Sequence, residues 1–301
     1  MTAGKEAAHP AAERIVVALD VAPDALTALL RALEGEARWY KVGMSLFYAA
    51  HREAIAAVRA AGGNVFLDLK LHDIPSTVAR TVAALADLGA AWLTVHALGG
   101  PKMLAAAQKA AEGGPKLLAV TVLTHHDPSE LRRLGLDAEP GRAALRLAGL
   151  AAEAGLFGVV AAPEEAAAIK AAYPSLFVVT PGIRWPGAPA AGDDQARILD
   201  PAAAIRAGSD ALVVGRPIYG SADPRAAFLA VRDAVAGALR PPATDRPGPN
   251  GPVGSTDAGL DAFLSYGPGQ TNEPGQGGKA DDRSVRPADR RGAGGGPEGA
   301  L

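Results

Sequence analysis

Residues 66–78 read FLDLKLHDIPSTV, a stretch that changes from an apolar run into the start of an amphipathic helix. Asp68 and Lys70 stand two positions apart in that run, so their side chains share one face of the predicted strand. The proline of DIPST then falls in the first turn of a helix, where proline is tolerated. A strand that leads directly into a helix is the repeating unit of a parallel α/β fold.

The same alternation of strand and helix runs through residues 14–240. Short apolar runs rich in β-branched residues alternate with Ala/Leu-rich stretches whose apolar positions recur every three or four residues. Eight runs are predicted to be strands: 14–20, 39–43, 64–70, 91–97, 116–124, 158–162, 177–183 and 211–216. Eight βα units in a chain of this size predict a (β/α)8 TIM barrel. An open doubly wound sheet is the alternative, but VALDVAP after the first run lacks the glycines of a dinucleotide-binding turn.

Composition changes on either side of the predicted catalytic barrel at 14–240. Residues 1–13 hold charges and proline without the apolar core of a signal peptide, and we expect a flexible segment there. Residues 241–301 are more than one third Gly and Pro, which predicts a disordered tail. Within this tail, the cluster LDAFLSY at 260–266 is either incidental or a docking segment.

Charge and cysteine content argue against several classes of partner. The 301 residues carry a formal net charge of −2 and a sequence pI of about 6.3, so neither nucleic acid nor a membrane surface is expected. The chain has no cysteine, which excludes disulfides, thiolate metal sites and a cysteine nucleophile, and fits a cytoplasmic location. No apolar run reaches the length of about 18 residues that predicts a membrane span.

Polar residues gather at the predicted carboxyl ends of the strands, which form one rim of such a barrel and carry its active site. These residues are Asp20, Lys41, Asp68, Lys70, Asp73, His96, Thr124, Arg184 and Arg216, and Pro181 and Gly215 stand at the same strand ends. Taken singly, Asp20 and Asp73 fit helix caps, and Asp68 with Lys70 fits a structural ion pair. The combined array of Lys41, Asp68, Lys70 and Asp73 is costly to bury unless it faces a ligand, so it indicates a functional site.

The last two predicted strands suggest a phosphate site. In VVGRPIY, the backbone at Gly215 and the guanidinium of Arg216 suit an anion near a helix start. The long connection at 180–198 is expected to be a lid that carries Arg184 and Gln195. We expect no metal site, because His125 and His126 are adjacent and their side chains should diverge.

The motifs that contain these residues resemble those of a known enzyme family. The chain resembles the orotidine 5'-phosphate decarboxylase family in VALD, KVGMSLF, FLDLKLHDIPSTV, TVHALGG, VTPGIR, DDQ and VVGRPI, in that order across residues 14–240. The resemblance implies a homodimeric (β/α)8 barrel that decarboxylates orotidine 5'-phosphate to UMP and CO2 in de novo pyrimidine biosynthesis, with no cofactor. The connection from Arg184 to Gln195 is slightly longer than the family pattern implies, and the tail after Arg240 lies outside that pattern.

The resemblance also implies a role for each site residue. Lys70 would protonate C6 of the pyrimidine, and Asp68 would lie beside the substrate carboxylate. By the same resemblance, Lys41 and Asp20 would bind the ribose, and Asp73 and Thr77 would reach the partner subunit's site. Thr124 and Pro181 would contact the pyrimidine. The phosphate would be bound by Arg184, Gln195, Arg216 and the Gly215 backbone.

Three other functions remain open. A related sugar-phosphate barrel shares the DxKxxD pattern but uses a divalent metal. A Schiff-base aldolase needs an amine of depressed pKa, whereas neighbouring carboxylates raise the pKa of an amine. A non-catalytic nucleotide sensor is expected to have lost a member of the charged array, and all four are present.

Overall fold

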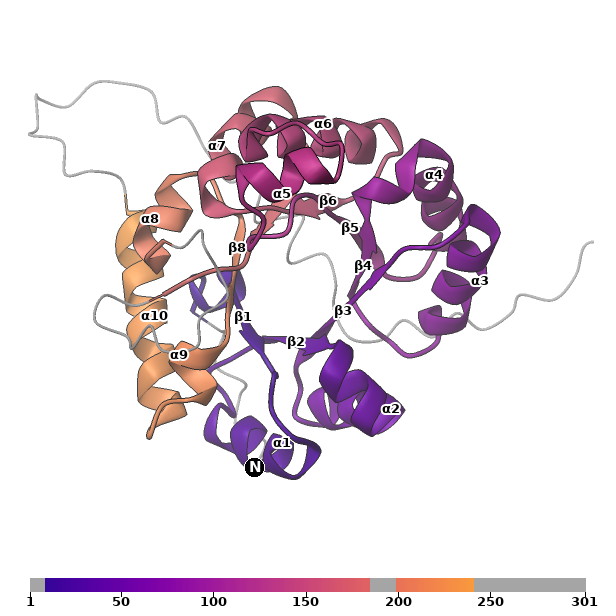
Figure 1. Cartoon of the computed structure of the whole chain (residues 1–301). Helices are drawn as coiled ribbons and strands as arrows, with labels where there is room; N and C mark the ends of the chain where they lie inside the picture. Colours follow the sequence, from indigo (N-terminus) through magenta and orange to yellow (C-terminus); the bar gives the residue numbers. More distant parts are fainter. Residues whose placement is uncertain (1–8, 185–198, 241–301) are drawn as a thin grey trace, which may run out of the picture. The chain divides into compact units, whose positions relative to one another are not determined.

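Eight parallel strands close into a barrel in the computed structural model, which describes residues 9–184 and 199–240 (Figure 1). Each strand pairs with the next one along the chain, and β8 pairs with β1 to complete the ring. The strands are β1 Ile15–Ala18, β2 Trp39–Gly43, β3 Asn64–Leu71, β4 Trp92–His96, β5 Lys116–Val120, β6 Gly158–Val160, β7 Phe177–Thr180 and β8 Ala211–Val214. The predicted TIM barrel is confirmed, and the open sheet is excluded.

Helices surround the ring of strands in Figure 1. They are α1 Pro23–Ala32, α2 Met44–Ala60, α3 Pro75–Ala86, α4 Gly100–Ala110, α5 Pro128–Arg133, α6 Pro140–Glu153, α7 Pro163–Ala172, α8 Pro201–Arg206, α9 Arg216–Tyr219 and α10 Pro224–Leu239, with short 3-10 turns η1 Ala12–Arg14 and η2 Ala97–Gly99. Seven of the helices in the described residues begin at a proline, whose missing N–H costs nothing in the first turn. The prolines therefore mark where the chain leaves each loop.

Aromatic rings fill the amino-terminal part of the barrel interior. We call this cluster the aromatic floor: Trp39, Phe66, Trp92, Phe157 and Phe177. Trp39 and Trp92 stack with ring centroids 3.9 Å apart, and Phe157 and Phe177 stack at 5.0 Å. Phe66 meets Trp92 edge-on at 5.6 Å. The floor is buried separately from the larger core between strands and helices.

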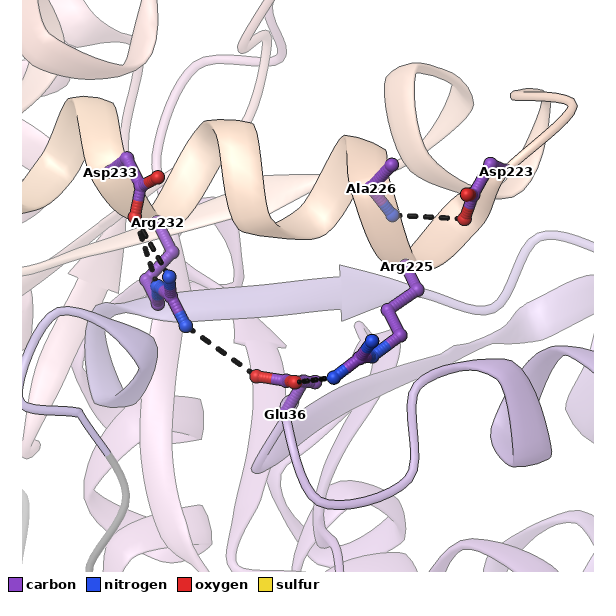
Figure 2. Close-up of polar contacts among 6 residues, drawn as sticks. All are labelled: Glu36, Asp223, Arg225, Ala226, Arg232 and Asp233. Carbon is purple, nitrogen blue, oxygen red and sulfur yellow. Dashed lines mark hydrogen bonds and ion pairs between the residues drawn. The ribbon is translucent and has the colours of Figure 1, made fainter.

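The first and last βα units meet at a seam outside the barrel. Val17 of β1 pairs with Val214 of β8. Glu36, in the turn that follows α1, lies between Arg225 and Arg232 of α10 and forms an ion pair with each (Figure 2). These contacts join segments almost 200 residues apart in the sequence.

The boundaries of the barrel differ in detail from the prediction. β5 ends at Val120, so Thr124 lies in the turn beyond it and not on the strand. Ala11 and Ala12 are buried, so the packed part of the chain begins before residue 14. The tail at 241–301 and its cluster at 260–266 lie outside the described residues. Within the described ranges, no helix is long and apolar enough to cross a membrane.

Candidate active site

A cavity of about 510 Å³ opens at the carboxyl ends of the strands. A volume of this size suits a small organic ligand. Nine of the predicted site residues line it: Asp20, Lys41, Asp68, Lys70, Thr124, Pro181, Arg184, Gly215 and Arg216. The strand ends therefore bring together residues from six of the eight βα units.

A line of alternating charges crosses one wall of the cavity. Lys41 Nζ lies 3.0 Å from Asp20 Oδ1 and 3.6 Å from Asp68 Oδ2, and Lys70 Nζ lies 2.8 Å from the same oxygen of Asp68. Asp68 thus stands between two ammonium groups. The helix-cap interpretation of Asp20 is not supported, because the cap of α1 is Ala22 and the Asp20 carboxylate pairs with Lys41.

The charges in this line stabilise one another despite burial. Burial alone would raise the pKa of Asp68, but Lys41 and Lys70 outweigh it and hold the pKa below its ordinary value. Burial alone would lower the pKa of Lys41, but the carboxylates of Asp68 and Asp20 outweigh it and raise the pKa. At neutral pH the Asp68 carboxylate and the Lys41 ammonium are therefore both charged.

Gly43 leaves room for this pair. A Cβ atom at Gly43 would lie 3.0 Å from Lys41 Nζ and 3.1 Å from Asp20 Oδ1. Any larger residue at the end of β2 would press on the ion pair. This requirement follows from the packing and was not predicted from the sequence.

Lys70 reaches the cavity through an irregular backbone. The register between β3 and β4 shifts between Leu67 and Leu71, so β3 bulges where Lys70 lies. Lys70 has a φ of 50°, in the left-handed region that non-glycine residues seldom adopt. The prediction that Asp68 and Lys70 face the same cavity is confirmed, but a regular strand does not produce that arrangement.

Asp73 and Thr77 lie on the rim outside the cavity lining. Asp73 is exposed, and its Oδ1 accepts a hydrogen bond from the backbone N–H of Ile74 at 2.6 Å. Thr77 lies in the first turn of α3, where its Oγ1 accepts a weak hydrogen bond from Arg80 at 3.5 Å. In the described part of the chain, neither residue contacts Asp68 or Lys70.

Two arginines and a glycine also line the cavity, and β8, which leads to Gly215 and Arg216, pairs with β1, which leads to Asp20. Gly215 follows β8 as the N-cap of α9, and Arg216 is the first residue of that helix. Arg184 Nη1 donates to the carbonyl of Ile183 at 2.9 Å, and both arginines line the cavity.

Tyr219 also lines the cavity. Burial, and next the charge of Asp20, raise the pKa of its hydroxyl. Sequence reasoning missed Tyr219, whose position one helical turn after Gly215 was the available signal. Gln195 lies outside the described residues.

Four of the six histidines lie near this rim. His96 on β4 is buried and stacks on His72 with ring centroids 5.3 Å apart. Burial, and then the charges of His72, Lys70 and His126, lower the pKa of His96 to about 4. The expectation that His125 and His126 diverge is wrong: their ring centroids lie 4.1 Å apart, because both fall in the turn after β5 where no strand alternation separates them.

A family model and curated proteins match this chain over most of its length. A family model described as the orotidine 5'-phosphate decarboxylase / HUMPS family matches residues 13–231. The chain belongs to this family. A curated orotidine 5'-phosphate decarboxylase from Halorhodospira halophila (strain DSM 244 / SL1) is 50% identical over 234 residues, covering 76% of this chain and 98% of the relative. One from Pseudomonas aeruginosa (strain LESB58) is 46% identical over 222 residues, covering 72% and 95%.

Two solved structures share the fold of this chain. The crystal structure of orotidine 5'-phosphate decarboxylase from Lactobacillus acidophilus matches with a TM-score of 0.64 at 37% identity, covering 73% of this chain and 98% of that one. The crystal structure of an uncharacterized conserved protein from Geobacillus kaustophilus also matches with a TM-score of 0.64, at 33% identity, covering 73% and 99%. The match of the family model, residues 13–231, ends before the tail at 241–301.

Proposed function

We propose that this chain decarboxylates orotidine 5'-phosphate to UMP and CO2 as a step of pyrimidine biosynthesis. The observation that supports it best is the line of charges in which Asp68 stands between Lys41 and Lys70. This arrangement lies at the mouth of a cavity that Arg184 and Arg216 also line. Such a cavity can hold a phosphate at one end and the reacting carbon at the other.

The reaction needs a site that stabilises negative charge on carbon. When the bond between C6 and the carboxylate breaks, its electron pair remains on C6 and the carboxylate leaves as CO2. The ammonium of Lys70 then donates a proton to C6, and the neutral amine regains a proton from solvent. A fixed ammonium both stabilises the developing carbanion and delivers the proton, so this step requires no cofactor or metal ion.

The other side chains would orient the substrate. Asp68 would lie beside the departing carboxylate, while Lys41 and Asp20 would bind the ribose hydroxyls. Thr124 and Pro181 would contact the pyrimidine. Phosphate would bind Arg184, Arg216, Gln195 and the backbone N–H at Gly215, and this remote binding energy would hold the reacting carbon in place.

We further propose that the active form is a homodimer in which Asp73 and Thr77 reach the site of the partner. Support comes from the exposed apolar side chains on the connections after three consecutive strands. These are Met44 and Tyr48 after β2, Ile74 after β3 and Leu98 after β4, with exposed fractions of 44%, 66%, 63% and 41%. An apolar surface of this kind, next to the exposed Asp73, suits a second copy of the chain.

A cytoplasmic location completes the proposal and is supported by the absence of cysteine from the sequence.

The description of the matching family also names HUMPS, so a metal-dependent sugar-phosphate reaction is the second candidate function. Its support is the shared DxKxxD spacing of Asp68, Lys70 and Asp73.

One assay separates the two candidates. Purified protein is treated with EDTA, and the conversion of orotidine 5'-phosphate to UMP is followed by the loss of absorbance. We expect full activity without added metal. Activity that disappears with EDTA and returns with Mg²⁺ would support the sugar-phosphate candidate.

Subunit exchange tests the shared site. Asp73→Ala and Lys70→Ala should each be nearly inactive alone. After dissociation and reassociation at equal amounts, about half of the dimers are mixed and each has one intact site, so roughly a quarter of wild-type activity should return. If exchange is verified and no activity returns, Asp73 acts within its own chain or not at all.

A further inference from the structure

Thr94 links the two central charged residues although it lies outside the cavity lining. Its side chain is on β4 and is fully buried. Thr94 Oγ1 donates a hydrogen bond to Asp68 Oδ1 at 3.0 Å and accepts one from the backbone N–H of Lys70 at 2.7 Å. One hydroxyl therefore contacts both the carboxylate and the backbone that carries the ammonium.

The Thr94 hydroxyl gives the backbone N–H of Lys70 a hydrogen-bond partner at the bulge. Where β3 shifts register against β4, the backbone N–H of Lys70 donates a hydrogen bond to the Thr94 hydroxyl. A backbone N–H away from water needs a partner, and a non-glycine residue with a φ of 50° needs surrounding contacts to keep it there. Without the hydroxyl, the backbone at Lys70 loses the hydrogen bond that holds its left-handed conformation.

The contact to Asp68 fixes how its carboxylate is turned. Oδ2 faces both ammonium groups, Lys70 at 2.8 Å and Lys41 at 3.6 Å, while Oδ1 is held by the uncharged hydroxyl of Thr94. Because the two oxygens have different partners, rotation of the carboxylate would break all of these contacts. Thr94, which lies outside the cavity lining, thus holds the Asp68 carboxylate in one orientation relative to the two ammonium groups.

We propose that Thr94 is a positioning residue for the reaction, holding Asp68 and the backbone of Lys70 in the arrangement that decarboxylation requires. This inference rests on the proposed function. Thr94 does not touch the substrate, so its loss should reduce turnover and leave the affinity for UMP nearly unchanged. Misplacement of catalytic groups by about 1 Å costs on the order of 10²-fold in rate.

The test compares Thr94→Val, which keeps the shape, with Thr94→Ser, which keeps the hydroxyl. We expect kcat to fall about 10²-fold in the first and to stay within about threefold of wild type in the second. Since the Thr94 hydrogen bond also lowers the pKa of Asp68, the acidic limb of the kcat profile should move to higher pH in Thr94→Val. If Thr94→Val does not fold, Thr94→Ala replaces it.

Thr121→Val is the matched control. Thr121 is also fully buried, and its hydroxyl donates to the carbonyl of Val160 at 2.9 Å without contacting the charged line. It should lose stability but keep kcat. Equal losses of kcat in the Thr121 and Thr94 variants, an inactive Thr94→Ser, or wild-type kcat in Thr94→Val would each overturn the inference. If wild type itself fails to decarboxylate orotidine 5'-phosphate, the proposed function fails instead.

A separate cluster of ligand atoms lies in the connection after β5. Nitrogen atoms of His125 and His126 and a carboxylate oxygen of Glu130 all lie within 4.8 Å of one another. His126 Nδ1 is buried and makes no hydrogen bond to a described residue, and Glu130 Oε2 faces it at 3.4 Å. Two imidazoles and a carboxylate are ligands that Zn²⁺ and similar ions prefer, with water in the fourth position.

We infer from this convergence a binding site for a divalent transition-metal ion at His125, His126 and Glu130. The site is distinct from the charged line, and decarboxylation does not require it. Modest side-chain movement would bring the three groups to coordination distance, since metal–ligand bonds of about 2 Å place ligands closer together than they lie here.

Titration of the EDTA-treated full chain with Co²⁺ tests this site. We expect visible absorption that saturates at one ion per chain and is displaced by Zn²⁺. The double variant His125→Asn/His126→Asn should lose this absorption, while His51→Asn should keep it, because His51 lies in α2 and is not part of the cluster. No saturable absorption, or the same absorption in the double variant, would overturn the inference.

Discussion

The two ends of the barrel interior are built from the same strands but have opposite chemistry. On β2, Trp39 belongs to the aromatic floor and Lys41 to the charged line, and on β3 Phe66 is followed in the same way by Asp68. Each step of two residues advances about 6.6 Å along a strand and returns to the same face. A single step therefore separates a stacked ring from a buried charge.

The two ends of the barrel contribute to different properties, stability and catalysis. The floor contributes burial and rigidity, since large aromatic side chains account for much of the apolar area inside the barrel. The charged mouth contributes chemistry, and its ions are stable only because each is next to an opposite charge. We therefore expect substitutions at the mouth to change rate and substitutions in the floor to change stability.

The largest expected effect is at the mouth. Lys70→Ala should lower kcat by about 10³-fold or more, because proton donation and charge stabilisation are lost together. The free energy of unfolding should change by only about 1 kcal/mol, since Lys41 still faces Asp68. Steady-state kinetics and urea denaturation measure the two quantities.

Lys170→Ala is a matched control for Lys70→Ala. Lys170 pairs with Asp210 at 3.0 Å, and the exposure of this pair, 29% and 12%, is close to the 30% and 12% of Lys70 and Asp68. The control should keep kcat, because Lys170 lies outside the cavity lining. Comparable losses of kcat in both variants would erase the proposed distinction.

The next largest effect is in the floor. Trp92→Ala should lower the free energy of unfolding by about 3 to 5 kcal/mol, because Trp92 contacts four other aromatic rings. The rate per folded molecule at low temperature should stay within a fewfold of wild type. Trp92→Phe is the milder companion if the first variant does not fold. A floor variant that loses rate without losing stability would contradict the division.

A smaller effect concerns pH and His96. Its pKa of about 4 in the folded chain lies below the ordinary value of 6.5, so the unfolded chain binds this proton more readily. Stability is therefore lost as pH falls from about 6.5 to about 4, on the order of 3 kcal/mol from this group. In His96→Asn, the difference in unfolding free energy between pH 7 and pH 4.5 should be smaller than in wild type. An unchanged difference would mean that His96 titrates normally.

The smallest effect is expected outside the barrel, at the seam of Figure 2. Glu36→Gln removes ion pairs to Arg225 and Arg232, whose side chains are 60% and 25% exposed. Solvent weakens such pairs, so the free energy of unfolding should fall by about 1 kcal/mol or less and kcat should not change. A loss several times larger in denaturant titration would show that the seam is a principal source of stability.

Much of this architecture was predictable because the strand and helix periods are strong in the sequence. Eight apolar runs separated by helices allowed one closed barrel, and the carboxyl ends of the strands then placed Lys41 and Asp68 together. These predictions depend on alternation, which regular strands obey.

Features that depend on broken alternation were not predictable. The bulge at Lys70, the bond from Thr94 and the convergence of His125 with His126 all arise where a strand shifts register or has already ended. The aromatic floor also went unrecognised, since single aromatic residues at strand starts reveal their stacking only after the ring is closed. The sharing of Asp73 and Thr77 between subunits stays a prediction, as it concerns a second copy of the chain.

The pairing of β8 with β1 has a consequence for how the chain is made. Seven of the eight strand pairings join neighbours in the sequence, and they can begin to form while synthesis continues. The eighth joins the first strand to the last, and loop-closure entropy opposes it until the whole barrel has left the ribosome. Until then β1 has an unpaired edge, which is the kind of surface that chaperones protect from aggregation.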